Sequence, residues 1–265
     1  MSSNARSHGL TSTYGAVPGW SKKQVKAVPA VKAPRTMHTN RMQPNGVIGT
    51  KSSAAKGIDV SGYTGNVDWA SFRSQGYTFA YAKASEGNYY TSKLGPSQVS
   101  GAKAAGFTTG MYHFANPSVS GGAEQADYFI ARGGGWTPGS LPGVVDLEWN
   151  PYAGNSCYDL TNSAMQNWIV AFQDEYKAKT GTYPTIYTAT AWWNQCIGTW
   201  GPTVALIAER SPLWLANYSG SVGSTPYAWA NQKNWQYAAV DSGGYDLNQF
   251  NGDWAVLAAF SKIGY

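Results

Sequence analysis

Hydrophobic and polar positions from Gly57 onward follow the pattern of short strands separated by helices. Strand-like runs rich in β-branched and aromatic residues recur at 57–61, 77–85, 107–115, 141–149, 184–189, 211–218, 234–240 and 245–250. The segments between the early runs, 67–75, 96–106 and 123–134, have helical patterns. Such alternation favours parallel β/α units, and eight strands suit a closed barrel. We predict a single (β/α) barrel of TIM type, irregular in its C-terminal half because full helices are missing between the later strands.

The clearest predicted helix runs from Ser163 to Lys179. Ser163 and Gln166 have the spacing of a capping box, in which each side chain satisfies a free backbone amide at the start of a helix. Apolar residues recur at helical spacing at Met165, Trp168, Ile169, Phe172 and Tyr176. Gly181 follows as the expected stop.

Residues 1–56 have a different composition. They hold nine Lys and Arg residues, four prolines and no acid, and no helical or strand period continues through the prolines. We expect a basic flexible arm, either a linker or a propeptide, ahead of a folded main domain at 57–265. That domain has ten Lys and Arg against fourteen Asp and Glu, so we expect no nucleic-acid partner.

The overall composition excludes several classes of protein. A hydrophobic fraction of 43% is enough for a sizeable core and excludes general disorder. The longest apolar run, Trp254 to Phe260, is far shorter than the roughly 20 residues of a bilayer span. No secretory signal is visible in the first residues. The 12 Trp and 18 Tyr residues each offer a flat apolar face and a polar tip, which suits a substrate that is itself a stack of rings and hydroxyls.

The sequence contains two cysteines, Cys157 and Cys196. We favour a disulfide between them, which implies an oxidising compartment, over the alternative of two buried thiols. There is no CxxC pattern, and His113 is the sole histidine of 57–265, so we expect no metal and no cofactor.

Five acids fall on or beside predicted strands: Asp59, Glu86, Asp146, Glu148 and Asp246. Reactive groups of β/α barrels lie at strand ends, and acids are poor strand formers, so five surface acids placed there by chance would be improbable. Asp146 and Glu148 are one residue apart, which puts both side chains on one face of a strand. Their mutual repulsion would keep one protonated near neutral pH, as glycosidic cleavage requires, although such a pair also occurs by chance or binds metals.

The motifs of 57–265 resemble those of the glycoside hydrolase family 25 lysozymes, the Chalaropsis-type muramidases. The resemblance runs through GIDVSGYTGNVDWASFRSQG, YAKASEGNYY, AKAAGFTTGMYHFANP, VVDLEW, IYTATAWW, LWLANY and NWQYAAVDSGGYDLNQFNGD. The loop EGNYYTSKLGP departs from the family, which often has an acid or amide shortly after this aromatic.

This resemblance implies hydrolysis of the β-1,4 bond between N-acetylmuramic acid and N-acetylglucosamine in peptidoglycan. It makes Glu148 the general acid and Asp146 the partner that orients or stabilises the reacting sugar, with Asp59 and Asp246 shaping the charge around them. It also implies that a sugar groove is lined by Tyr112, Tyr187, Trp214, Trp235 and Glu86, although core packing is an equally good reading of each aromatic.

Two other functions stay open at this point: a catalytically silent peptidoglycan-binding module on the same fold, and a chitin-type glycosidase. We expect a monomer that acts outside the cell or at a cell wall and has no membrane partner. The missing signal suggests a phage-encoded lysin or a mature form.

Overall fold

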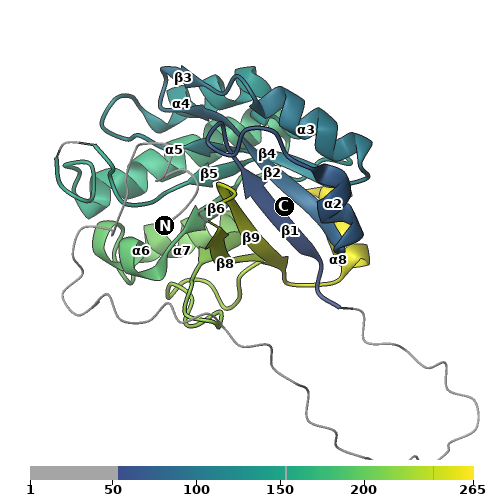
Figure 1. Cartoon of the computed structure of the whole chain (residues 1–265). Coiled ribbons are helices and arrows are strands. Elements are labelled where there is room, and N and C mark those ends of the chain that lie inside the picture. The colour runs from purple at the N-terminus through teal and green to yellow at the C-terminus, as the bar shows by residue number, and fades with distance from the viewer. Residues whose placement is uncertain (1–52, 153, 241) are drawn as a thin grey trace, which may run out of the picture.

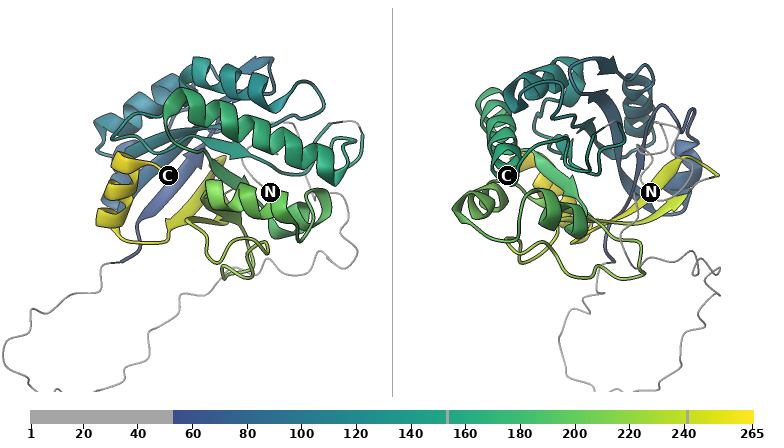
Figure 2. Two further views of the ribbon diagram at one scale, coloured as in Figure 1. Left: turned by 180° about the vertical axis from the view of Figure 1, so that it is seen from behind. Right: turned by 90° about the vertical axis from the view of Figure 1, so that its left-hand side faces the viewer.

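The computed structural model describes residues 53–152, 154–240 and 242–265. It shows a closed barrel of eight strands with helices around its outside (Figures 1 and 2). The strands are β1 (Lys56–Val60), β2 (Tyr77–Glu86), β3 (Tyr90–Thr91), β4 (Thr108–Phe114), β5 (Val144–Asp146), β6 (Thr185–Thr188), β7 (Leu213–Ala216), β8 (Asn234–Val240) and β9 (Tyr245–Phe250). The helices are α2 (Trp69–Ser74), α3 (Gly95–Ala104), α4 (Gly122–Phe129), the π-helical η1 (Ile130–Gly134), α5 (Asn162–Thr180), α6 (Thr190–Cys196), α7 (Pro202–Arg210) and α8 (Trp254–Ile263).

The barrel closes because β1 pairs with β2 on one side and with β9 on the other. All neighbours from β1 round to β8 are parallel, whereas β9 is antiparallel to both β8 and β1. The end of β2 extends past its pairing with β1 and forms a short hairpin with β3. The predicted β/α barrel is confirmed. Its irregular C-terminal half is confirmed as well, because the described residues of the β7–β8 and β8–β9 connections contain no helix.

The core has two layers. Inside the barrel lies a cluster rich in aromatic residues that includes Phe79, Tyr81, Tyr112, Tyr187, Trp214 and Phe250. A larger cluster fills the space between the strands and the helices, with Ile58, Val60, Phe129, Ile169 and Phe172 among its members. Gly57 is part of the reason the inner layer fits, because a Cβ there would lie 2.3 Å from the ring of Phe79. Because aromatic side chains fill the inside of the barrel, a polar site has room only at one end of it.

Helix α5 begins differently from the expected capping box. Its N-cap is Thr161, whose side chain accepts a hydrogen bond from the amide of Ala164, so the assignment to Ser163 is wrong. Gln166 instead donates to the carbonyl of Ile197, a tertiary contact that outweighs the local one. The predicted stop is confirmed, since Gly181 has a φ of 78° in the left-handed region.

Helix α8 is the apolar run that begins at Trp254. Its residues Leu257 and Phe260 join the inner aromatic layer, and the ring of Phe260 lies 5.8 Å from that of Phe250. The sequence patterns predicted neither this helix nor α6, α7 and β3. Within the described part of the chain, no helix is both long and apolar enough to span a membrane.

The predicted disulfide is confirmed. Cys157 and Cys196 are bonded, with their Cα atoms 5.3 Å apart, and they join the β5–α5 loop to the end of α6. The bridge anchors the loop that follows Asp146 at the end of β5 and that contains Glu148.

The predicted arm, residues 1–56, lies outside the described residues as far as residue 52. Its last residues are part of the barrel: Ala55 is buried, its amide donates to Gly252, and Lys56 begins β1.

Candidate active site

Four carboxylates gather at the mouth of the barrel where the parallel strands end. Asp59 lies near the end of β1, Asp146 is the last residue of β5, and Glu148 follows two residues later. Asp246 is at the start of β9, but the antiparallel direction of this strand pairs it directly with Asp59. All four side chains belong to residues that are at most 4% exposed. The structure therefore brings the four predicted catalytic acids to one place.

Two amide side chains hold the Asp59 carboxylate. Gln236 on β8 donates to Asp59 Oδ2 at 2.9 Å and to Asp246 Oδ2 at 3.3 Å. Asn248 on β9 donates to Asp59 Oδ2 at 2.7 Å. Buried carboxylates need such donors because desolvation otherwise penalises the charge. The sequence analysis identified neither amide. The one available signal was the strand period of two, because each amide lies two residues from another inward-facing residue of its own strand.

The inner aromatic layer orients these amides. Tyr187 donates to Gln236 Oε1 at 2.7 Å, and Tyr218 donates to the same oxygen. Trp214 donates from its indole nitrogen to Asn248 Oδ1 at 2.9 Å. Because each amide oxygen is occupied by a donor, each amide NH2 group is turned toward the carboxylates.

Asp146 and Glu148 form the second carboxylate pair. Leu147 between them packs in the outer hydrophobic layer, so the two acids share the inward side, as predicted. Burial raises the pKa of Asp146 well above its ordinary value, the negative charge of Glu148 raises this pKa further, and the positive charge of Lys83 lowers it. Burial and repulsion thus favour a proton on the pair, and because the two acids are coupled that proton belongs to both residues.

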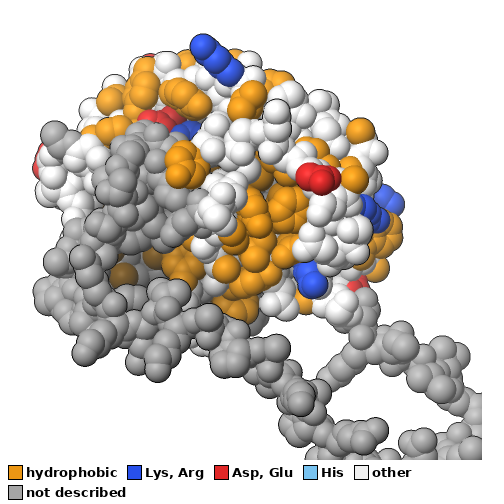
Figure 3. Space-filling model, viewed as in Figure 1, with side chains coloured by type: hydrophobic (Ala, Val, Ile, Leu, Met, Phe, Trp, Pro, Cys, Tyr) orange, Lys and Arg blue, Asp and Glu red, His pale blue; other side chains and the backbone are white. Residues whose placement is uncertain are grey.

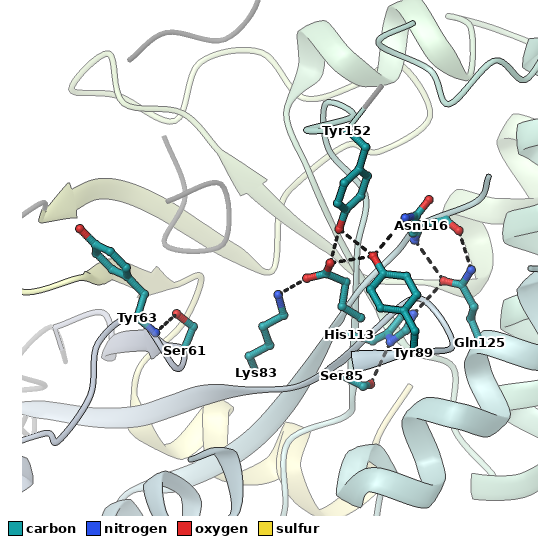
Figure 4. Close-up of polar contacts among 10 residues, drawn as sticks. Ser61, Tyr63, Lys83, Ser85, Tyr89, His113, Asn116, Gln125 and Tyr152 are labelled. Atoms are coloured by element: carbon teal, nitrogen blue, oxygen red, sulfur yellow. Dashed lines mark hydrogen bonds and ion pairs between the residues drawn. The ribbon is translucent and has the colours of Figure 1, made fainter. Parts of the chain in front are cut away.

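Glu86 is the centre of a separate hydrogen-bond network, and its partners Lys83, Tyr89 and Tyr152 are labelled in Figure 4. Lys83 forms an ion pair with its Oε2, while Tyr89 donates to its Oε1 at 2.8 Å and Tyr152 donates to the same atom. Lys83 is only 2% exposed, and the sequence reasoning missed it. The signal was present in YAKAS, where a lysine occupies an inward position of an otherwise apolar strand.

His113 takes no part in the carboxylate cluster. Its Nδ1 contacts Ser85 at 2.9 Å and its Nε2 contacts Gln125 at 3.0 Å, while its ring stacks on Phe172 outside the barrel. Burial lowers its pKa to about 4, so the ring is neutral at neutral pH. Among the residues that the structure describes, no group of three or more His, Cys, Asp and Glu could hold a metal ion.

The predicted sugar-binding aromatics lie in two kinds of place. Tyr112, Tyr187 and Trp214 are buried at 5% exposure or less, in the inner layer beneath the carboxylates. Trp235 is next to the inward-facing Gln236 on β8 and therefore points to the opposite face, where its indole donates to Asn217. The structure does not bring Trp235 to the acids.

Exposed tyrosines at the mouth escaped the sequence reasoning. Tyr63, Tyr89 and Tyr90 are between 37% and 53% exposed, and with Lys93 they line a cavity of about 530 Å³. On the face drawn in Figure 3, hydrophobic side chains gather over β1 and β9 and charged ones are sparse. The charges that act on Asp146 belong to buried residues, namely Glu148, Lys83 and Asp59.

This arrangement supplies the two groups that glycosidic bond cleavage needs. A carboxyl pair that shares one proton can give it to a leaving oxygen and then face the positive sugar as an anion. The amide-held Asp59 and Asp246 add negative potential at the same mouth.

Comparisons with known proteins agree with this chemistry. The model of the family described as glycosyl hydrolases family 25 matches residues 58–243, a span that includes Asp59, Asp146 and Glu148. The N,O-diacetylmuramidase of Arthroderma benhamiae is 42% identical over 83% of this chain and 92% of its own length. The N,O-diacetylmuramidase of Chalaropsis sp is 41% identical over 74% and 94%. The crystal structure of a bacterial lysozyme from Streptomyces coelicolor superimposes with a TM-score of 0.75 at 41% identity, over 79% of this chain and 98% of that one.

The family match covers well over half of the chain, and the relatives match along nearly their whole length. The chain thus belongs to glycosyl hydrolases family 25 and is a glycoside hydrolase of the lysozyme type.

Proposed function

We propose that the chain cleaves the β-1,4 bond between N-acetylmuramic acid and N-acetylglucosamine in peptidoglycan, with Glu148 as the general acid. The observation that carries this proposal is the buried Asp146–Glu148 pair at the barrel mouth. Desolvation and mutual repulsion disfavour a second negative charge, so the pair holds a proton that Glu148 can transfer. The muramidase relatives support the identity of the substrate.

In the proposed reaction Glu148 gives its proton to the glycosidic oxygen as the bond from that oxygen to the sugar C1 breaks. The bonding electrons stay on the oxygen, and the leaving sugar departs as an alcohol. The Asp146 carboxylate stabilises the positive charge that develops at C1. Water then supplies hydroxide to C1, and its remaining proton returns to Glu148.

Asp59 and Asp246 act in this proposal through their charge and their fixed amide partners. Tyr112, Tyr187 and Trp214 form the floor of the groove, which sets how deeply a sugar ring can descend toward the acids. Glu86 lies at the rim, where it holds Tyr89 and Tyr152.

The test is digestion of purified peptidoglycan followed by mass spectrometry of the products. New reducing ends on N-acetylmuramic acid support the proposal, whereas reducing ends on N-acetylglucosamine contradict it. Equal digestion of chitin oligomers would favour the chitin-type glycosidase. Protein that sediments with walls but neither clears the suspension nor releases sugar would indicate a silent binding module.

We also infer that the protein acts at bacterial walls outside the cell, as a monomer. The Cys157–Cys196 disulfide supports this location because such bonds persist in oxidising compartments. The basic residues of 1–56 would bring the enzyme to polyanionic walls by screened attraction.

A further inference from the structure

Lys83 is a buried lysine inside the barrel. Its neighbours Ala82 and Ala84 on β2 pack in the outer layer, and Tyr81, two residues earlier, packs in the inner one. The side chain of Lys83 therefore enters the barrel above the aromatic floor, where it is 2% exposed. Lysine is almost never buried to this degree unless it is paired.

Several groups around Lys83 favour its charged form, although burial is the larger effect and lowers its pKa. Glu86 forms an ion pair with it, and the rings of Tyr90 and Phe114 lie 5.0 and 5.3 Å from its Nζ. Burial lowers the pKa of Lys83, while the charge of Glu86 and its hydrogen bond raise it. Glu86 is itself satisfied by two tyrosine hydroxyls, which favour its anionic form.

The strand register places this cation beside the catalytic pair. Glu86 is the β2 partner of Phe114 on β4, and Phe114 is in turn the β4 partner of Asp146 on β5. An ammonium over the Phe114 ring is therefore next to the strand end that presents Asp146. The charges of Asp146 and Glu148 both act on Lys83, and the charge of Lys83 acts on Asp146.

The other titratable groups at the mouth either raise the pKa of Asp146, opposite to the effect of Lys83, or are neutral. Asp59 on β1 raises the pKa of Asp146, as Glu148 does. Tyr158 in the β5–α5 loop keeps its proton, because burial and the charges of Glu148, Asp146 and Glu86 raise its pKa. His113 on β4 is neutral above its pKa of about 4.

We infer that Lys83, held by Glu86, is a positioning residue that limits the Asp146–Glu148 pair to one proton. Two buried carboxyls without a nearby cation favour the doubly protonated form, which has no anion to face the reacting sugar. The fixed ammonium expels the second proton, so that donor and anion coexist. This inference rests on the proposed function and assigns Lys83 a part in it.

The experiment compares the pH dependence of kcat/KM on soluble muropeptides for the wild type and for Lys83→Met. Loss of the cation raises the proton affinity of the pair, so both limbs of the profile should move to higher pH, by about 1 pH unit. Lys83→Arg keeps a cation and should leave the limbs in place. Lys179→Met, which removes a half-exposed lysine from its ion pairs with Asp127 and Glu175, is the matched control.

Because Lys83→Met leaves Glu86 buried without its cation, a second variant guards against misfolding. Lys83→Met/Glu86→Gln removes both charges and keeps an oxygen for Tyr89 and Tyr152. An upward displacement is expected again, because the charge of Lys83 lowers the pKa of Asp146, and it should be smaller than in Lys83→Met because the negative charge of Glu86 is lost as well. Limbs that stay at the wild-type pH in both variants, with only a lower rate or Tm, would overturn the inference.

A carboxyl titration by 13C NMR makes this result independent of catalysis. It should show the pair taking up its second proton at higher pH in either methionine variant. If Glu148→Gln remained active while this titration moved, the assignment of the general acid would fail and the role of Lys83 in the charge of the pair would stand.

Discussion

Asp59 and Asp246 stand directly opposite each other across the antiparallel β1–β9 pair, and one amide, Gln236, donates to both carboxylates. Neighbouring buried anions repel, so their stability depends on donors fixed in place. The site thus uses neutral amides for this pair and a cation, Lys83, beside the other pair.

Gln236→Leu should weaken both the fold and the reaction. The substitution removes a donor from two buried carboxylates and leaves the hydroxyls of Tyr187 and Tyr218 without their acceptor. We expect a loss of about 1–3 kcal/mol in the free energy of unfolding, measured by urea denaturation. Gln249→Leu, on the exposed side of β9, is the control and should cost much less. Equal stability of the two variants would show that the bridging amide is unimportant.

Glu148→Gln should reduce turnover at least about 100-fold, because the amide keeps the shape of the side chain and cannot transfer a proton. The rate of reducing-end release on soluble muropeptides measures the effect, and circular dichroism checks the fold. Glu209→Gln, on the exposed side of α7, should be fully active. A Glu148→Gln enzyme with a tenth of the wild-type rate would falsify the assignment.

Asp146→Asn should lose activity and yet gain stability at neutral pH. The raised pKa of Asp146 means that folding favours its protonated form, so its contribution to stability falls as pH rises above its ordinary value of about 4. Asparagine cannot ionise and avoids this cost. The Tm difference between the variant and the wild type should grow from pH 4 to pH 7.

Asp174→Asn, which alters an exposed ion pair with Arg210, provides the control for Asp146→Asn. Its Tm should follow the wild type across the same pH range. An Asp146→Asn protein that is less stable than the wild type at pH 7 would contradict the proposal that burial of the ionised Asp146 carboxylate lowers the free energy of unfolding.

His113 should remain neutral until pH falls to about 4, in contrast to a free histidine near 6.5. The unfolded chain takes up this proton first, so stability is lost as pH falls from about 6.5 to 4, by up to roughly 3 kcal/mol. Urea denaturation at several pH values measures the loss, and NMR of the imidazole follows the proton. Protonation of a folded His113 at pH 6 would show that the ring is not confined as described.

A chain that starts at Ser53 should fold with nearly unchanged Tm and cut soluble muropeptides at the full rate. Ser53 is a better start than Lys56, because Ala55 is buried and makes backbone hydrogen bonds with the β9 end of the barrel. Any deficit should appear on intact walls at low salt, since a charge attraction is screened beyond about 8 Å at 0.15 M. A lower rate of cleavage of soluble muropeptides would indicate that part of the arm packs against the barrel.

The sequence was most informative where local periodicity and tertiary structure agree. The one-residue spacing of Asp146 and Glu148 predicted a shared face because a strand has a side-chain period of two. Strand positions were predictable for the same reason, since aromatic and β-branched runs are bounded by turn residues.

Other features depend on contacts that a local pattern does not contain. Gln236 and Asn248 look like ordinary strand residues until β9 is placed between β1 and β8. Trp235 was predicted to line the groove because it lies at a strand end that matches the family. Its neighbour Gln236 is the residue of β8 that faces inward. Ser163 had the better local pattern for a cap, but Gln166 is engaged by Ile197, and Thr161 caps the helix.

The position of β9 next to β1 has a consequence for the stage of synthesis at which the barrel can close. The first strand of the barrel can close only against the last one, because β1 pairs with β9. A nascent chain from which β9 has not yet emerged therefore lacks both the closing strand and Asp246. Wall-cutting ability should appear only after β9 has been made and has paired with β1 and β8.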